Sequence, residues 1–173
     1  MKIAVVRHGE TDWNRLGKMQ GQEDIPLNET GKRQAADAAD RLSGSLWTAI
    51  VSSPLARARQ TGEIIARKLG IQTILADPGF TERHLGRISG MLIPEFDRLY
   101  PDGQCSEIEP WEPLQERMAQ TLLKYAEIFQ PRDFIAVSHG WAIKALLALG
   151  QADAGVLKNG GITFLEYAAG RFT

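Results

Sequence analysis

Two arginines, two histidines and one glutamate occur at positions that suggest a shared site. Arg7 and His8 directly follow an apolar run at the start of the chain, and His139 follows another such run. Arg57 and Glu82 come soon after two further apolar runs. If these groups meet, the cations repel one another unless an anion lies among them, and the forked donors of arginine match the oxygens of phosphate. The residue types therefore predict a site for a phosphoryl group.

The elements that must position these residues alternate between strands and helices. Apolar runs bounded by turn residues predict strands over 2–6, 48–53, 71–76, 134–138 and 161–168. Helical spacing of apolar residues, with Asn28 and Ser53 as caps, predicts helices over 29–44, 54–69, 114–129 and 141–149. Residues 77–113 are expected to be irregular, apart from one short helix near 95–100.

This alternation predicts an α/β protein, namely a three-layer α/β/α sandwich whose mostly parallel sheet is covered by helices on both faces. The last strand follows the preceding helix too closely for a full crossover. It is therefore predicted to be antiparallel and to lie at an edge of the sheet. The length of 173 residues fits a single domain over residues 1–173.

The predicted sheet brings the candidate residues together at one edge. Ligands of open α/β sheets bind beyond the carboxyl ends of the parallel strands, and the candidates all follow such ends. Arg57 falls in the first turn of its helix, where backbone N–H groups and the helix dipole also favour an anion. Gly9, directly after the first histidine, is expected to let the backbone turn sharply.

Each candidate also has a simpler interpretation when it is taken alone. The Arg-His pair after the first strand could be exposed, and Arg57 could belong to a solvated helix face. His139 could be a packed core histidine, and Glu82 alone would be assigned to the surface. His84 fits a substrate contact and an exposed loop equally well. The coincidence of these residues at successive strand ends favours the shared site.

Composition and absent motifs argue against other chemistries. The formal net charge of −1 does not indicate binding to nucleic acid or to a membrane surface. A zinc site built from His8, Glu82 and His139 would lie beside two arginines, which repel a cation. The sequence contains no H-E-x-x-H, no P-loop, no G-x-G-x-x-G and no G-x-S-x-G. No metal and no cofactor are therefore expected.

The cellular setting is read from the cysteine count and from the start of the chain. The single cysteine, Cys105, cannot form an internal disulfide, which favours a reducing compartment, here the cytoplasm. The first residues lack the long apolar region of a signal peptide, and no apolar stretch approaches the roughly 18 residues of a membrane helix. The sequence does not indicate the oligomeric state.

Several segments carry motifs that are highly specific when taken together. They read VVRHGETDWN, MQGQEDIPLNETGKRQA, VSSPLARARQTGEII, TERHLGRISG and VSHGWAIKALL. In this order, over residues 3 to 149, they resemble the histidine phosphatase superfamily (branch 1), whose fold is phosphoglycerate-mutase-like. Gly62 stands where alanine is usual in this family, and Ser89 where glutamate is common.

The resemblance implies a role for each candidate residue. His8 would be the nucleophile that takes the phosphoryl group, and Glu82 would protonate the leaving oxygen and then activate water. Arg7, Arg57 and His139 would hold the phosphoryl oxygens. The phosphate and substrate site would be completed by Asn14, Gln20, Gly21, His84 and Gly140. Residues 77–111 would form a lid over the substrate, and no metal or cofactor is implied.

The function implied by the resemblance is a phosphatase that hydrolyses a phosphomonoester through a phosphohistidine intermediate on His8. A cofactor-dependent phosphoglycerate mutase is one alternative, although mutases of this family carry an insertion before the second histidine that is absent here. A phosphate-binding module without turnover is another, but it would not need an acid such as Glu82. The expected partner is a small phosphorylated metabolite. Sugar phosphates, cobamide precursors, phosphoglycerates and phosphoproteins all remain open as substrates.

Overall fold

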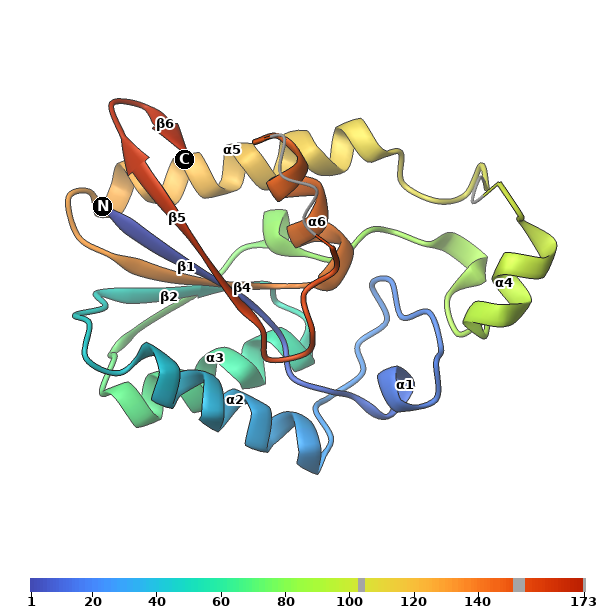
Figure 1. Ribbon diagram of the computed structural model, residues 1–173, viewed down its shortest axis with the longest axis horizontal. Coiled ribbons are helices and arrows are strands. Elements are labelled where there is room, and N and C mark those ends of the chain that lie inside the picture. Colours follow the sequence, from blue (N-terminus) through green and yellow to red (C-terminus); the bar gives the residue numbers. More distant parts are fainter. Residues whose placement is uncertain (103–104, 151–154, 173) are drawn as a thin grey trace.

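The computed structural model describes residues 1–102, 105–150 and 155–172. Over these ranges a six-stranded sheet forms the central layer, with strand order β3-β2-β4-β1-β5-β6, and helices cover both of its faces (Figure 1). The strands are β1 (Lys2–Arg7), β2 (Ala49–Ser52), β3 (Thr73–Ala76), β4 (Phe134–Ser138), β5 (Ile162–Ala168) and β6 (Arg171–Phe172). The first four are parallel, whereas β5 and β6 are antiparallel to their neighbours. The mostly parallel α/β/α sandwich predicted from the sequence is confirmed.

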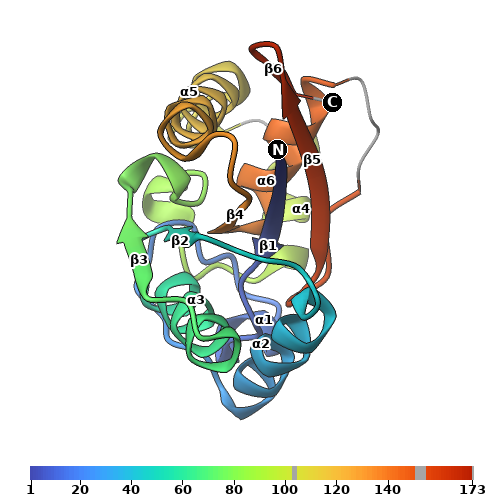
Figure 2. The ribbon, with the colours of Figure 1, turned by 90° about the vertical axis from the view of Figure 1, so that its left-hand side faces the viewer.

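Two pairs of helices form the outer layers, and Figure 2 shows them on opposite sides of the sheet. The helices α2 (Glu29–Leu42) and α3 (Ala56–Leu69) pack on one face, and α5 (Trp111–Phe129) and α6 (Gly140–Ala148) pack on the other. Side chains alternate between the faces of a strand. In β1, Ile3 and Val5 therefore pack with α5 and α6, whereas Ala4 and Val6 pack with α2 and α3.

The segments before α2 and between β3 and α5 contain more regular structure than the sequence predicts. They include α1 (Asp12–Arg15) and the 3₁₀ helices η1 (Pro78–Phe80) and η2 (Gly86–Ile88), whereas α4 (Ile93–Leu99) is the short helix predicted near residues 95–100. Thr11 and Asn14 cap α1 reciprocally, each accepting from the backbone N–H of the other. A four-residue helix has no apolar period, so only its cap could have indicated it. Residues 103–104 of the predicted lid lie outside the described residues.

Two predicted details need correction. α3 begins at Ala56 rather than at Pro54, because Leu55 has extended backbone and occupies the cap position. Ser53 caps no helix; its Oγ instead accepts from the N–H of Leu55 at 3.3 Å. β5 is antiparallel to β1, as predicted, but β6 pairs on its outer side and forms the edge.

None of the helices in the described ranges has the length and apolar character of a membrane span.

The sheet order brings two of the candidate segments together. β1 and β4 are neighbours, and their register pairs Arg7 with Ser138. The next residues, His8 and His139, therefore leave the sheet at the same point. β2 lies on the other side of β4 and leads into α3, which carries Arg57 in its first turn.

Candidate active site

His8 lies at the carboxyl end of β1 and is only 2% exposed. Its Nδ1 lies 2.6 Å from the carbonyl oxygen of Gly9. A carbonyl oxygen can only accept, so Nδ1 of the neutral ring carries the hydrogen and Nε2 keeps its electron pair. Glycine is required at position 9 because a Cβ there would lie 2.3 Å from the carbonyl oxygen of Gly31, at the start of α2.

His139 follows β4 and is fully buried, with its ring centroid 5.1 Å from that of His8. Arg57 Nε donates to its Nδ1 at 3.2 Å, so the neutral ring carries its hydrogen on Nε2. Among the described residues, neither this Nε2 nor the buried Nε of Arg7 has a hydrogen-bond partner. A buried polar group without a partner costs about 1–3 kcal/mol. Two such donors beside His8 are what an anion-binding site provides.

The guanidinium of Arg57 is fully buried and also holds a loop. Its Nη1 donates to the carbonyl oxygen of Glu23 at 2.6 Å, and its Nη2 donates to that of Gly21 at 2.7 Å. Burial lowers the pKa of Arg57 to about 10, although the charge of Glu82 opposes this shift. Arg57 is therefore still a cation at neutral pH, and it anchors the loop that includes Gln20.

Two amide side chains on the segment after β1 have their oxygens engaged by the protein. Oδ1 of Asn14 accepts from the N–H of Thr11 at 3.2 Å, and Oε1 of Gln20 accepts from Thr11 Oγ1 at 2.9 Å. The amide nitrogens can only donate, so they are left for an acceptor outside these contacts. Thr11 thus fixes the orientation of both amide groups.

Glu82 lies between η1 and η2, and backbone N–H groups hold its carboxylate. Oε1 accepts from Arg83 and from Ala142, both at 2.9 Å, and Oε2 accepts from Trp141 at 3.2 Å. The latter two N–H groups belong to the first turn of α6, where a carboxylate complements the helix dipole. α6 begins directly after His139, so one helix end connects the glutamate with the second histidine.

A cavity of about 310 Å³ opens among these groups. The predicted site residues in its wall are Arg7, His8, Asn14, Gln20, Gly21, Arg57, Glu82 and Gly140. His139 contacts His8 and Arg57 but is not part of this wall. The side chain of His84 is exposed and lies outside the wall, while its backbone N–H donates to Glu109.

The wall also contains residues that the sequence analysis does not single out. They are Lys18, Met19, Leu85, Ile93, Phe96, Asp97, Trp141 and Val156. Ile93 and Phe96 lie three residues apart on α4, and this spacing could have indicated one face of a helix. For Val156, in the segment before β5, the sequence offers no comparable pattern. The predicted phosphoryl residues therefore share the cavity with an apolar wall.

Burial lowers the pKa of His8 well below 6.5, and the charges of Arg57 and Arg7 lower it further. Burial also lowers the pKa of His139 well below 6.5, with Arg57 as the next largest cause. Both rings are therefore neutral at pH 7 in the free protein. A neutral His8 has the electron pair on Nε2 that a nucleophile needs.

The neutral histidines predict that the free energy of unfolding falls in mild acid. The unfolded chain takes up protons on these histidines below about pH 6.5, whereas the folded protein does not until the lowered pKa is reached. Between about pH 6.5 and the lowered pKa, each histidine should therefore decrease the free energy of unfolding by up to about 1.4 kcal/mol for each pH unit. Urea unfolding of wild type and His139→Gln, between about pH 7.5 and pH 5.5, measures the effect. Equal pH dependence in both proteins would contradict a neutral His139.

The charges and contacts around the cavity define a class of site. In the described ranges, no group of three or more histidine, cysteine, aspartate or glutamate side chains is arranged to hold a metal ion. The positive charge comes instead from Arg7 and Arg57, beside a neutral histidine at the carboxyl end of a parallel strand. The fold and the cavity are those of an α/β protein with an anion site suited to a phosphoryl group.

The chain belongs to the histidine phosphatase superfamily (branch 1), whose family model matches residues 3–173. It is 41% identical over 145 residues to a Bacillus subtilis (strain 168) protein named uncharacterized phosphatase PhoE, covering 84% of this chain and 75% of that protein. It is 33% identical over 162 residues to a probable phosphoglycerate mutase, GpmB, of Serratia proteamaculans (strain 568), covering 86% and 74%. The solved structure of Bacillus stearothermophilus YhfR matches with a TM-score of 0.91 at 26% identity, covering 99% of this chain and 94% of that one. The resemblance drawn from the motifs is confirmed.

Proposed function

We propose that this protein is a phosphatase that hydrolyses a small phosphomonoester through a phosphohistidine intermediate on His8. One observation carries the proposal: Nδ1 of His8 contacts the carbonyl oxygen of Gly9, which leaves Nε2 unprotonated in a cavity lined by Arg7 and Arg57. Hydrolysis is supported by a relative that is 41% identical to this chain and is named a phosphatase. A cavity of about 310 Å³ suits a small metabolite.

In the first step, Nε2 of His8 attacks the phosphorus atom, and the bond to the leaving oxygen breaks as the P–N bond forms. Arg7, Arg57 and the Nε2–H of His139 stabilise the negative charge on the transferred oxygens. Glu82 in its protonated form donates its proton to the leaving oxygen. The products of this step are the free alcohol and the phosphohistidine.

In the second step, Glu82 is a carboxylate and accepts a proton from a water molecule as the water oxygen attacks phosphorus. The P–N bond breaks, His8 recovers its electron pair, and inorganic phosphate leaves. The backbone contacts from Trp141 and Ala142 support both roles, because they hold the carboxyl group in one place throughout the cycle.

Phosphoglycerate mutation is a second candidate, because a relative that is 33% identical is named a probable mutase. A mutase returns the phosphoryl group to an organic hydroxyl, whereas a phosphatase passes it to water. We would incubate the protein with p-nitrophenyl phosphate and a panel of phosphorylated metabolites, and follow both phosphate release and phosphoglycerate interconversion. We expect phosphate release to be the faster reaction. Interconversion without release would favour the mutase, and phosphate binding without either reaction would favour a module that only binds.

We further propose that residues 1–173 act as one domain in the cytoplasm, on a free small molecule. The single cysteine, Cys105, supports a reducing compartment. The net charge of −1 supports a partner other than nucleic acid. A lid role for residues 77–111 is supported by Leu85, Ile93 and Phe96, which this segment contributes to the cavity wall.

Chelation is expected to leave the phosphatase activity unchanged. Arginines supply the positive charge that a metal ion would otherwise supply, and Arg7 and Arg57 in the wall disfavour a divalent cation. The measurement is phosphate release before and after dialysis against EDTA, with and without added Mg²⁺ or Zn²⁺. Loss of activity on dialysis, followed by recovery with one of these ions, would contradict the metal-independent mechanism.

A further inference from the structure

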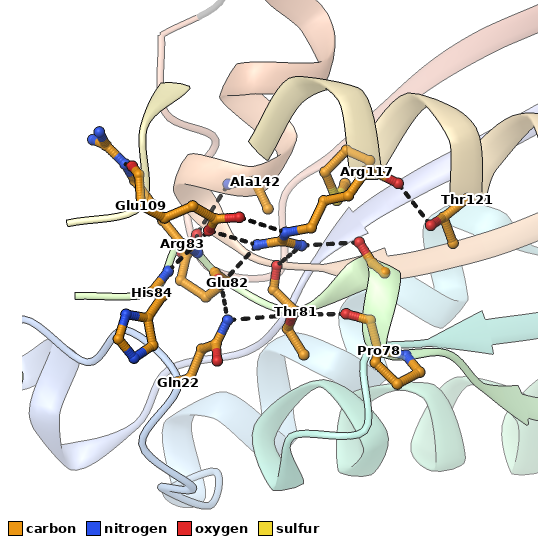
Figure 3. Close-up of polar contacts among 12 residues, drawn as sticks. Gln22, Pro78, Thr81, Glu82, Arg83, His84, Glu109, Arg117, Thr121 and Ala142 are labelled. Carbon is orange, nitrogen blue, oxygen red and sulfur yellow. Dashed lines mark hydrogen bonds and ion pairs between the residues drawn. The ribbon is translucent and has the colours of Figure 1, made fainter. Parts of the chain in front are cut away.

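A cluster of side chains outside the cavity holds the segment that carries Glu82 (Figure 3). Arg117 of α5 binds both carboxylate oxygens of Glu109, through Nε at 2.8 Å and Nη2 at 3.0 Å. Its other hydrogens reach the carbonyl oxygens of Gly79, Thr81 and Glu82 at 2.9, 2.8 and 2.9 Å. All five hydrogens of the guanidinium are thereby used. We call Arg117 and Glu109 the clamp.

Glu109 extends the clamp to His84, on the far side of Glu82 along the chain. Its Oε2 accepts from the N–H of His84 at 3.0 Å, and its own N–H donates to the carbonyl oxygen of His84 at 2.8 Å. Burial alone would raise the pKa of Glu109, but the hydrogen bonds from Arg117 and His84 lower it below its ordinary value. The two side chains are 23% and 16% exposed, so the pair is better shielded than a surface ion pair. The clamp is therefore an ion pair between the guanidinium of Arg117 and the carboxylate of Glu109.

The clamp fixes the backbone on both sides of Glu82. It holds Gly79 and Thr81 before the glutamate, the carbonyl of Glu82 itself, and His84 after it. The carboxylate of Glu82 reaches the first turn of α6 and the cavity from this backbone. A shift of the backbone would therefore move the carboxylate relative to the phosphoryl site. The clamp residues themselves are not part of the cavity wall.

We propose that Arg117 and Glu109 are positioning residues for acid catalysis, which hold the Glu82 carboxyl group at the leaving oxygen. This inference rests on the proposed function, because it takes Glu82 as the acid. A displacement of about 1 Å at a reacting group can cost about 100-fold in rate. A clamp that acts only through Glu82 affects proton transfer to the leaving oxygen and leaves the phosphate pocket unchanged. A purely structural role would instead affect all substrates alike.

The test compares Arg117→Met and Glu109→Gln with wild type on two kinds of substrate. The burst of leaving group is measured with an alkyl phosphate such as phosphoserine, and with p-nitrophenyl phosphate, whose leaving group needs little protonation. We expect the burst rate to fall roughly 10- to 100-fold for the alkyl substrate and less than about threefold for the aryl substrate. Inhibition by inorganic phosphate should be unchanged.

A matched control comes from a second Arg-Glu pair in the same segment. Arg87 pairs with Glu107, but its side chain is 85% exposed. In the part of the chain that the structure describes, the hydrogen bonds of Arg87 go to Glu107, and none reaches the backbone of residues 79–84 that carries Glu82. Arg87→Met should therefore match wild type on both substrates. Glu109→Gln preserves the side-chain size, so it remains informative if Arg117→Met does not fold.

Three outcomes would overturn the proposal. A folded clamp variant could keep wild-type burst rates. Its burst rates with the alkyl and the aryl substrate could fall by the same factor. It could also bind inorganic phosphate more weakly than wild type does. Glu82→Gln is measured alongside to separate this proposal from the proposed function. If Glu82→Gln lowers the burst rate much more for the alkyl than for the aryl substrate while the clamp variants do not, only the proposal for the clamp is rejected. If Glu82→Gln does not discriminate, Glu82 is not the acid, and the clamp proposal falls with that assignment.

Discussion

Replacing His8 with alanine is expected to lower turnover by at least about 10,000-fold, because the covalent route through Nε2 is lost. The phosphate pocket should remain, since Arg7, Arg57 and His139 are untouched. His8 is buried at the end of β1, so the substitution leaves a small cavity, and a cost of about 1–3 kcal/mol in the free energy of unfolding is expected. Steady-state phosphate release and urea unfolding measure the two effects.

Binding of inorganic phosphate is the control for this variant. His8→Ala should bind phosphate about as tightly as wild type, because it retains both arginines. Its circular dichroism spectrum should also match that of wild type. Substantial turnover by a folded His8→Ala protein would contradict the covalent mechanism and would favour direct attack by water.

The second large effect is expected at Glu82. General acid catalysis is worth about 100- to 10,000-fold, so Glu82→Gln should slow the first step by this factor for alkyl phosphates, whose leaving oxygen is a strong base. For p-nitrophenyl phosphate the loss should be much smaller. Glutamine replaces one carboxylate oxygen with an NH₂ group that can only donate, so one of the N–H groups of Trp141 and Ala142 would lose the separate oxygen that accepts from it in the wild type. The burst of leaving group isolates the first step from the hydrolysis of the intermediate.

Arg57→Ala is the comparison for this experiment. In the proposed mechanism Arg57 stabilises the transferred phosphoryl group, so its loss should slow alkyl and aryl substrates by the same factor. Because Arg57 also holds the carbonyl groups of Gly21 and Glu23, the variant must be shown to be folded before its rates are compared. Equal losses on both substrates in Glu82→Gln would contradict the assignment of the acid.

The order of apolar runs was sufficient to predict most of the fold. Residues 3–6 and 134–137 are apolar on both faces, which is typical of strands covered by helices on two sides. The histidines that follow these runs could be placed at one edge of the sheet, because the carboxyl ends of parallel strands meet there. β6 was missed because a two-residue strand has no pattern of its own.

The parts of the site that could not be predicted depend on contacts between distant segments. Arg117 lies on a helix after the lid, and its partners lie more than thirty residues earlier, at Gly79, Thr81 and Glu82. On the helix alone it resembles any solvated arginine. The apolar residues Ile93 and Phe96 of α4 likewise become part of the cavity wall only when residues far apart in the sequence come together there.

The protonation pattern of the two histidines is also a tertiary property. The sequence places His8 next to Gly9, but it does not show that the ring turns back to the carbonyl oxygen of Gly9. The contact of Arg57 with Nδ1 of His139 depends on the packing of α3 against β4. These two contacts leave an electron pair on one ring and a hydrogen on the other, which are the two properties that phosphoryl transfer needs.

The central claim is that the phosphoryl group passes through His8, and trapping the intermediate tests it most directly. In Glu82→Gln with p-nitrophenyl phosphate, the first step needs little acid and the second step lacks its base, so the intermediate should accumulate. The reaction is stopped in alkali, because phosphohistidine is labile in acid, and the peptides are examined by mass spectrometry. We predict one phosphate, on the peptide that contains His8, and none in a His8→Ala protein treated in the same way. Phosphate on His139 or His84, or no phosphopeptide above the His8→Ala background, would contradict the account.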